Sequence, residues 1–272
     1  MKKVFYLRKR NRLGERPMHY YILGQLSVRS TLSPVSLPPK PQQVLASLVV
    51  NIGQVTYVDE LIDEVWRDDP PASAATTLQT YVCKVRQLLG RAGHGTNWIV
   101  TRPQGYLLQG EPSDVDMYRF VDLVEQARGR IEDEPAAVGD LLRRALQMWR
   151  GPAFGGMRRG LCLESQAERL EELRLCAVEM LLRSSISMGR HSDVINDLRS
   201  LIVRHPYNEL LHGYLMFSLA ACGRRHDALR VYGDLQESFR NGLGLDPSTQ
   251  LVVLSRELLA GSAISLPFAE TR

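Results

Sequence analysis

Hydrophobic positions along the chain change their spacing, and the change separates a mixed α/β region from a helical one. The stretch MHYYILGQLSV at 18–28 alternates and is rich in β-branched and aromatic residues, so it predicts one or two strands. Three stretches with helical spacing follow, and WIVTRPQGYLL at 98–108 predicts a hairpin with a tight turn at Gly105. From residue 115 helical spacing continues to about residue 259. This order predicts an α+β domain followed by an all-α domain.

Each of the three helical stretches in the first region has its own start signal. Pro41 suits the first turn of the first helix, because a residue there needs no N–H donor. The second helix is expected to begin at Asp59–Glu60, where acids interact favourably with the helix dipole, and Ser73 is expected to cap the third. The segment QVTYV between the first two helices is expected to be extended. The inward-facing positions are Val44, Leu45, Leu48, Val49 and Ile52, then Leu61, Ile62, Val65 and Trp66, then Leu78, Val82, Val85 and Leu89.

The outer face of the third predicted helix has no acidic side chain, since no Asp or Glu occurs from Ala72 to Arg91. A carboxylate would be repelled by DNA phosphates, whereas Gln, Thr and Lys can bond to base edges. This face therefore suits a DNA groove, although a surface helix that only lacks acids would give the same pattern. Its outward residues are Gln79, Thr80, Cys83, Lys84 and Gln87.

The predicted hairpin supports the DNA-binding interpretation. Arg102 stands at its tip, and a narrow minor groove attracts such an arginine. Tyr106 is expected to pack its ring on the core. Three helices followed by a two-stranded wing is the winged helix-turn-helix layout, in which the second helix supports the third and the third enters the major groove.

The charge of the chain is unevenly distributed. Of its 272 residues, the first 112 contain 14 Lys and Arg against 8 Asp and Glu, and the remainder contains 20 against 22. A basic first half suggests that only this half meets a polyanion. The leader, residues 1–17, has seven basic residues and one acid, and is expected to be a flexible arm on DNA or a solvated tail.

Patterns for catalysis, metals and membranes are absent from the sequence. It contains no C-x-x-C, H-E-x-x-H, nucleophile elbow or G-x-x-x-x-G-K-[ST], so no enzyme, metal, cofactor or ATP-driven switch is expected. The longest apolar run, 44–50, is much shorter than the ~20 residues of a membrane span, and no secretory signal is found. We therefore expect a cytoplasmic protein associated with the nucleoid.

The second region contains two helix breaks that echo one another. Gly189-Arg190 and Gly223-Arg224 precede similar helical stretches and lie 34 positions apart, which is the period of a tetratricopeptide repeat. We predict an all-α tetratricopeptide-like domain; a generic helical bundle is the alternative. The predicted divisions are a leader at 1–17, a winged helix-turn-helix domain at 18–110, a helical domain at 114–260 and a tail at 261–272, with GEPSDVD at 110–116 as the linker.

Several separated motifs resemble one known family in the same order. The segments KPQQVLASLVVNIGQVTYVDELIDEVW, DDPPASAATTLQTYVCKVRQLLG and IVTRPQGYLL are similar to an OmpR/PhoB-type DNA-binding domain. The segments LLRRALQMWRGPAF, ERLEELRLCAVEMLL and LGLDPSTQL resemble a bacterial transcriptional activation domain. Together they resemble the SARP family of transcriptional activators. Only 17 residues precede the first strand, so a phosphorylatable receiver domain is not expected before it.

The resemblance implies roles for particular residues. The family's wing arginine falls on Arg102. Cys83 departs from response-regulator relatives, which often have a basic residue there. Base-reading positions fall on Gln79, Thr80, Cys83 and Lys84, and phosphate-contacting positions fall on Thr76, Thr77, Tyr81 and Arg86.

The resemblance also implies a function. A SARP activator binds direct repeats of double-stranded promoter DNA beside the −35 element, as a homodimer, and recruits RNA polymerase holoenzyme through its σ factor or α subunit. Pathway-specific control of secondary-metabolite genes is the role expected of such a protein. The alternative is a tetratricopeptide-type interaction scaffold whose DNA-binding domain is vestigial.

Overall fold

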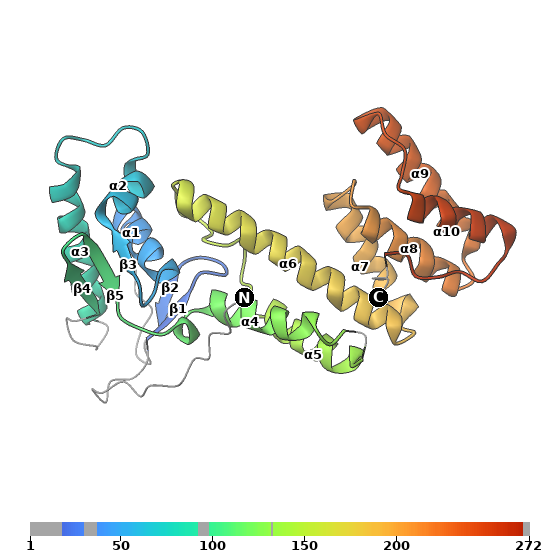
Figure 1. Ribbon diagram of the computed structural model, residues 1–272, viewed down its shortest axis with the longest axis horizontal. Coiled ribbons are helices and arrows are strands. Elements are labelled where there is room, and N and C mark those ends of the chain that lie inside the picture. Colours follow the sequence, from blue (N-terminus) through green and yellow to red (C-terminus); the bar gives the residue numbers. More distant parts are fainter. Residues whose placement is uncertain (1–17, 30–36, 92–97, 132, 269–272) are drawn as a thin grey trace. The chain divides into compact units, whose positions relative to one another are not determined.

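A computed structural model of the chain describes residues 18–29, 37–91, 98–131 and 133–268 (Figure 1). The predicted leader lies outside the described residues, as do the last four residues of the predicted tail. Two compact units divide the chain. Unit 1 comprises Met1–Leu123 and Ala145–Arg174, and unit 2 comprises Val124–Arg144 and Leu175–Arg272.

Unit 1 contains two small antiparallel sheets. Strands β1 (His19–Tyr21) and β2 (Ser27–Arg29) pair with each other, which confirms two strands near 18–28. The second sheet has the order β3-β5-β4, with β3 at Val55–Tyr57, β4 at Ile99–Arg102 and β5 at Gly105–Leu108. The β4–β5 hairpin is the predicted wing. The predicted extended segment QVTYV adds β3 to it as a third strand, with Thr56 opposite Tyr106.

The helices α1 (Pro39–Val50), α2 (Val58–Trp66) and α3 (Ala74–Arg91) follow the predicted order. Helix α1 begins at Pro39, two residues before Pro41. Both prolines lie in the first turn, where no N–H donor is needed. Every inward position predicted for the first and third helices is at most 3% exposed. In α2 only Leu61 of the predicted stripe is fully buried, while Ile62, Val65 and Trp66 are half-buried.

The predicted linker is mostly structured and packs on the first domain. It contains a 3-10 turn (Pro112–Asp114) and leads directly into α4 (Asp116–Arg128). The buried carboxylate of Asp116 accepts hydrogen bonds from the backbone N–H groups of Ile22 (2.8 Å) and Leu23 (3.2 Å), and it pairs with Arg150 at 3.2 Å. These contacts fix the start of α4 against the β1–β2 ribbon.

Unit 2 is helical. The long helix α6 (Leu161–Ser187) continues into it from unit 1, and α5 (Pro135–Leu146) lies mostly within it. The helices α7 (His191–Arg204), α8 (Glu209–Ala221), α9 (Arg225–Leu243) and α10 (Thr249–Ala260) follow. Gly189 and Gly223 adopt φ values of 74° and 76° at the turns before α7 and α9, which confirms the 34-residue repeat of helix pairs.

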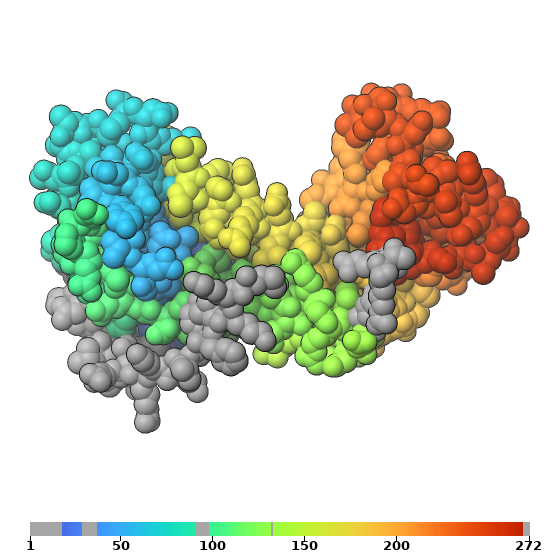
Figure 2. All heavy atoms as spheres, in the orientation of Figure 1, coloured from blue at the N-terminus to red at the C-terminus, as the bar shows by residue number. Residues whose placement is uncertain are grey.

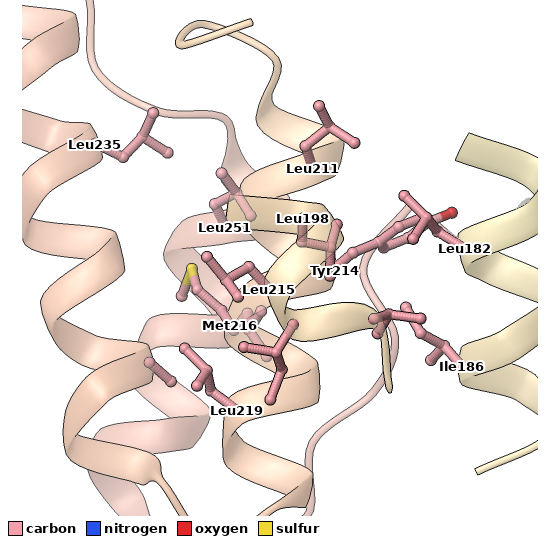
Figure 3. Close-up of a cluster of buried hydrophobic side chains, with 14 of the residues drawn as sticks. Leu182, Ile186, Leu198, Leu211, Tyr214, Leu215, Met216, Leu219, Leu235 and Leu251 are labelled. Carbon is pink, nitrogen blue, oxygen red and sulfur yellow. The ribbon is translucent and has the colours of Figure 1, made fainter. Parts of the chain in front are cut away.

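A core cluster of unit 2 is formed by apolar side chains of successive helices, many of them leucines (Figure 3). Leu198 of α7, Leu215 of α8 and Leu235 of α9 are at most 3% exposed. Part of the predicted tail also belongs here, because Ile264, Leu266 and Phe268 pack against this core.

Within the described parts of the chain, no helix combines the length and the apolar character that a membrane crossing requires.

Candidate DNA-binding surface

The outward face of α3 is open to solvent within the part of the chain that the structure describes. Figure 2 shows the teal atoms of the α2–α3 region at the molecular surface. Lys84 forms no ion pair with any described residue. The residues predicted to face outward, Gln79, Thr80, Cys83, Lys84 and Gln87, are all exposed.

The opposite face of α3 explains why this face is free. Leu78, Val82 and Val85 are at most 1% exposed, and α3 packs on both α1 and α2. Residues one position away on a helix point about 100° to the side, so burial of this stripe turns the polar residues outward. Cys83 accepts a hydrogen bond from Gln87 at 3.6 Å, so these two side chains lie together.

Near its N-terminus, α3 carries further predicted DNA contacts. Thr76 is exposed and Thr77 is half-buried. The Thr80 hydroxyl donates to the Thr76 carbonyl at 3.2 Å, and the hydroxyls of Ser73 and Thr77 are 3.5 Å apart. The Ser73 carbonyl accepts from the Thr77 N–H at 2.9 Å, which fits Ser73 as the residue before the first turn.

An aromatic rim borders this face on the α2 side. The half-buried ring of Tyr81 stacks on Trp66, with centroids 5.8 Å apart and planes at 16°. The ammonium group of Lys40, at the start of α1, lies 5.1 Å from the centre of the Trp66 ring. Tyr81 is therefore held in place by Trp66 while the residue stays partly exposed.

The wing carries Arg102 at its end, exposed and opposite Gly105 in the strand register. Gly105 is needed for a different reason from the one the sequence suggested. Its φ is not positive, but a Cβ there would overlap the carbonyl oxygen of Thr56 in β3. The glycine therefore permits close pairing of the wing with β3 rather than the turn itself. Tyr106 is 7% exposed, in agreement with the expected packing of its ring.

Arg86 differs from the other predicted phosphate contacts. It is half-buried, and its guanidinium group donates three hydrogen bonds to β4. Two reach the Ile99 carbonyl and one reaches the Thr101 hydroxyl. Arg86 thus joins α3 to the wing, whereas the family resemblance implies a phosphate contact for this residue.

Glu64 in α2 has an important structural role that the sequence pattern did not predict. The residue is only 3% exposed. Its carboxylate accepts hydrogen bonds from the backbone N–H groups of Gly160, Cys162 (3.1 Å) and Leu163 (3.2 Å) at the start of α6. These are donors that the first turn of a helix leaves unpaired. A Cβ on Gly160 would overlap the Glu64 backbone, so a glycine is required there. Burial raises the pKa of Glu64, and the three donors oppose that rise.

A second contact reinforces the junction of α2 with α6. Arg67, which ends α2 with φ 54°, donates to the Arg159 carbonyl at 2.8 Å. Arg159 in turn pairs with Glu164 of α6 at 3.0 Å. The supporting helix of the helix-turn-helix is therefore fixed to the segment that opens the long helix. A signal existed in the sequence, because Glu64 follows Leu61 by three positions and so shares its inward face.

Comparisons with known proteins agree with this arrangement. A family model described as bacterial transcriptional activator domain matches residues 115–259, and one described as transcriptional regulatory protein, C terminal, matches residues 33–108. Regulatory protein DnrI of Streptomyces peucetius is 35% identical over 250 residues, which cover 89% of this chain and 92% of DnrI. Transcriptional regulatory protein MoaR1 of Mycobacterium tuberculosis is 32% identical and is covered to 79% of its length. Regulatory protein AfsR of Streptomyces griseus is 31% identical, but only 22% of AfsR is covered.

A solved structure shares the fold. Mycobacterium tuberculosis EmbR, in complex with a low affinity phosphopeptide, matches 93% of this chain with a TM-score of 0.86 and 30% identity. The match covers 67% of the EmbR chain. MoaR1 and EmbR are named as transcriptional regulatory proteins, and DnrI and AfsR are named as regulatory proteins.

Proposed function

Because the chain belongs to the SARP family of transcriptional activators, we propose that it binds promoter DNA in a sequence-specific manner through α3 and the β4–β5 wing. Helix α3 enters the major groove, and Arg102 contacts the neighbouring minor groove. Gln79, Thr80 and Lys84 read base edges. Thr76, Thr77 and Tyr81 contact phosphates and fix the orientation of the helix.

The observation that carries this proposal is the exposed, acid-free face of α3. Its polar side chains are neutral or cationic, and the buried stripe behind it fixes their direction. A carboxylate on this face would meet the phosphate charge without compensation. Within unit 1, the described residues leave Gln79, Thr80 and Lys84 of this face exposed, which the proposal requires.

On the promoter, two protomers bind direct repeats beside the −35 element. Proteins that occupy one face of the duplex in the same orientation need sites separated by one helical turn, about 10–10.5 base pairs, or a multiple of it. Inserting five base pairs between the repeats would place the second protomer on the opposite face. Footprinting on such an altered promoter should show loss of joint protection.

The helical unit provides the activating contact. Helix pairs that stack at a 34-residue period form extended surfaces suited to other macromolecules. We propose that this surface binds RNA polymerase holoenzyme, through the σ factor or the α subunit, and that the target genes serve secondary metabolism. Transcription in vitro with purified polymerase, with and without the protein, tests activation separately from DNA binding.

The decisive test of DNA binding is a titration of labelled promoter fragments, read by gel shift and footprinting. Lys84→Ala should reduce the preference for the operator over random DNA by about 1–3 kcal/mol, the cost of one lost base contact. Arg256→Ala removes an equally exposed positive charge from α10 and should leave affinity unchanged. Unchanged protection by the Lys84 variant contradicts the placement of α3 in the groove.

The alternative function, an interaction scaffold with a vestigial DNA-binding domain, makes the opposite prediction. It predicts no retardation of any promoter fragment at either low or high salt. A specific complex that weakens as salt rises would exclude it, because phosphate contacts release counterions.

A further inference from the structure

Arg86 lies on α3 between the groove-facing residues and the wing, and its bonds all point to the wing. Its Nε atom donates to the Ile99 carbonyl at 3.0 Å, and Nη2 donates to the same oxygen at 2.8 Å. Nη2 also donates to the Thr101 hydroxyl at 2.8 Å. The guanidinium carbon is 5.9 Å from the centre of the Tyr106 ring in β5. Both strands of the hairpin therefore contact this one side chain.

The position of β4 in the sheet explains why the wing needs such a contact. Among the described strands, the order β3-β5-β4 makes β4 an outer strand, paired on one side only. An outer strand has backbone groups without a strand partner, and a short hairpin of this kind is held weakly by its own ladder. Arg86 supplies donors to β4 where the sheet does not.

We infer that Arg86 is a positioning residue that holds the wing against α3 and so determines where Arg102 meets DNA. This inference rests on the proposed DNA-binding function. It replaces a direct phosphate contact by Arg86, because two of its three guanidinium nitrogens are already engaged with β4. A planar guanidinium can hold a carbonyl through two N–H groups at once, and a lysine ammonium cannot reproduce that geometry.

Substituting Arg86 in two ways separates the roles. Arg86→Lys keeps the positive charge but loses the two-point hold on Ile99, whereas Arg86→Met loses both. If Arg86 positions the wing, the two variants weaken operator binding equally, by about ten-fold. If it is a direct phosphate contact, Arg86→Lys retains most of the affinity and the salt dependence of the wild-type protein, and the inference is overturned.

A double-mutant cycle with the wing arginine tests the dependence directly. Arg86→Met and Arg102→Ala should each weaken binding, and the double variant should be no weaker than the weaker single variant, because the same wing contact is lost in each. If the fold-loss in affinity of the double variant equals the product of the two single losses, the two arginines act independently and the inference is contradicted.

A measurement without DNA keeps the two proposals distinguishable. Amide hydrogen exchange in 99–108 should speed up in Arg86→Met, while exchange in the buried core of α1 stays as in the wild type. Unchanged exchange in the wing overturns the positioning role even if DNA binding is established. Failure of the wild-type protein to bind any promoter would instead overturn the proposed function, and the exchange result would still decide whether Arg86 holds the wing.

Discussion

Removing the Glu64 carboxylate should destabilise unit 1 because it leaves donors at the start of α6 without a partner. Of the three N–H groups that it accepts, those of Gly160 and Leu163 belong to buried residues. Each buried donor left unpaired costs about 1–3 kcal/mol, so Glu64→Ala should lower the free energy of unfolding by about 2–6 kcal/mol. A domain has only about 5–15 kcal/mol in total, so this loss is large.

Tryptophan fluorescence reports this loss selectively. The three tryptophans of the chain, Trp66, Trp98 and Trp149, all lie in unit 1, and Trp66 is two positions from Glu64. With a urea dependence of about 2 kcal/mol per molar, the fluorescence midpoint of Glu64→Ala should fall by about 1–3 M. Glu64→Gln keeps one acceptor oxygen, so its fluorescence midpoint should lie between those of Glu64→Ala and the wild type.

The matched control is Glu168→Ala, which removes an exposed glutamate from α6, the helix whose start Glu64 contacts. Its free energy of unfolding should stay within about 0.5 kcal/mol of the wild-type value, as for other surface substitutions. Equal midpoints for the Glu64 and Glu168 variants would refute the view that the carboxylate holds α2 to α6.

Three further predictions concern the pH dependence of stability, the wing and the core of unit 2. Burial raises the pKa of Glu64 above its ordinary 4.5, so its contribution to stability is greatest below that value and is lost as the pH rises through the folded pKa. The difference in unfolding free energy between wild type and Glu64→Gln should therefore be larger at pH 5 than at pH 8, and a difference that grows with pH would contradict this. Gly105→Ala should push β5 from β3, cost about 1–3 kcal/mol in the fluorescence-detected transition and weaken DNA binding, and an unaltered transition would show that the close approach is relaxed at no cost. Leu215→Ala should lower the free energy of unfolding by about 2–5 kcal/mol. Far-UV circular dichroism measures this loss because it follows the helices of unit 2, and a loss below about 1 kcal/mol would mean that this site is not tightly packed.

Periodic hydrophobic positions made most of the fold predictable. The stripe of α3, Leu78 to Leu89, could be assigned because its neighbours on the outer face are all polar or small. The helix pairs of unit 2 could be assigned because Gly189 and Gly223, which both have positive φ, lie 34 residues apart, one just before α7 and the other just before α9. Both signals are local, and a local signal survives in a single sequence.

Long-range contacts between polar groups were not predictable in the same way. Asp116 falls in the segment predicted as a polar linker, and Glu64 has no predicted role, yet both are buried and accept hydrogen bonds from backbone N–H groups distant in sequence. Their partners belong to loops and helix ends, which carry no periodic pattern. Arg86 was placed correctly on α3, but its bonds to β4 depend on how the hairpin returns to the helix.

The central claim is that the outward face of α3 lies in the major groove, and the cysteines of the chain allow a direct measurement of it. Cys83 is exposed on that face, while Cys162 and Cys222 are exposed elsewhere. Operator DNA carrying a thiol tethered to a base in the major groove, scanned along the footprinted site, should form a disulfide with Cys83 at one or two adjacent positions and with neither of the other two. A bound complex in which Cys83 forms no such link at any position, or in which Cys162 or Cys222 reacts in its place, would contradict the account.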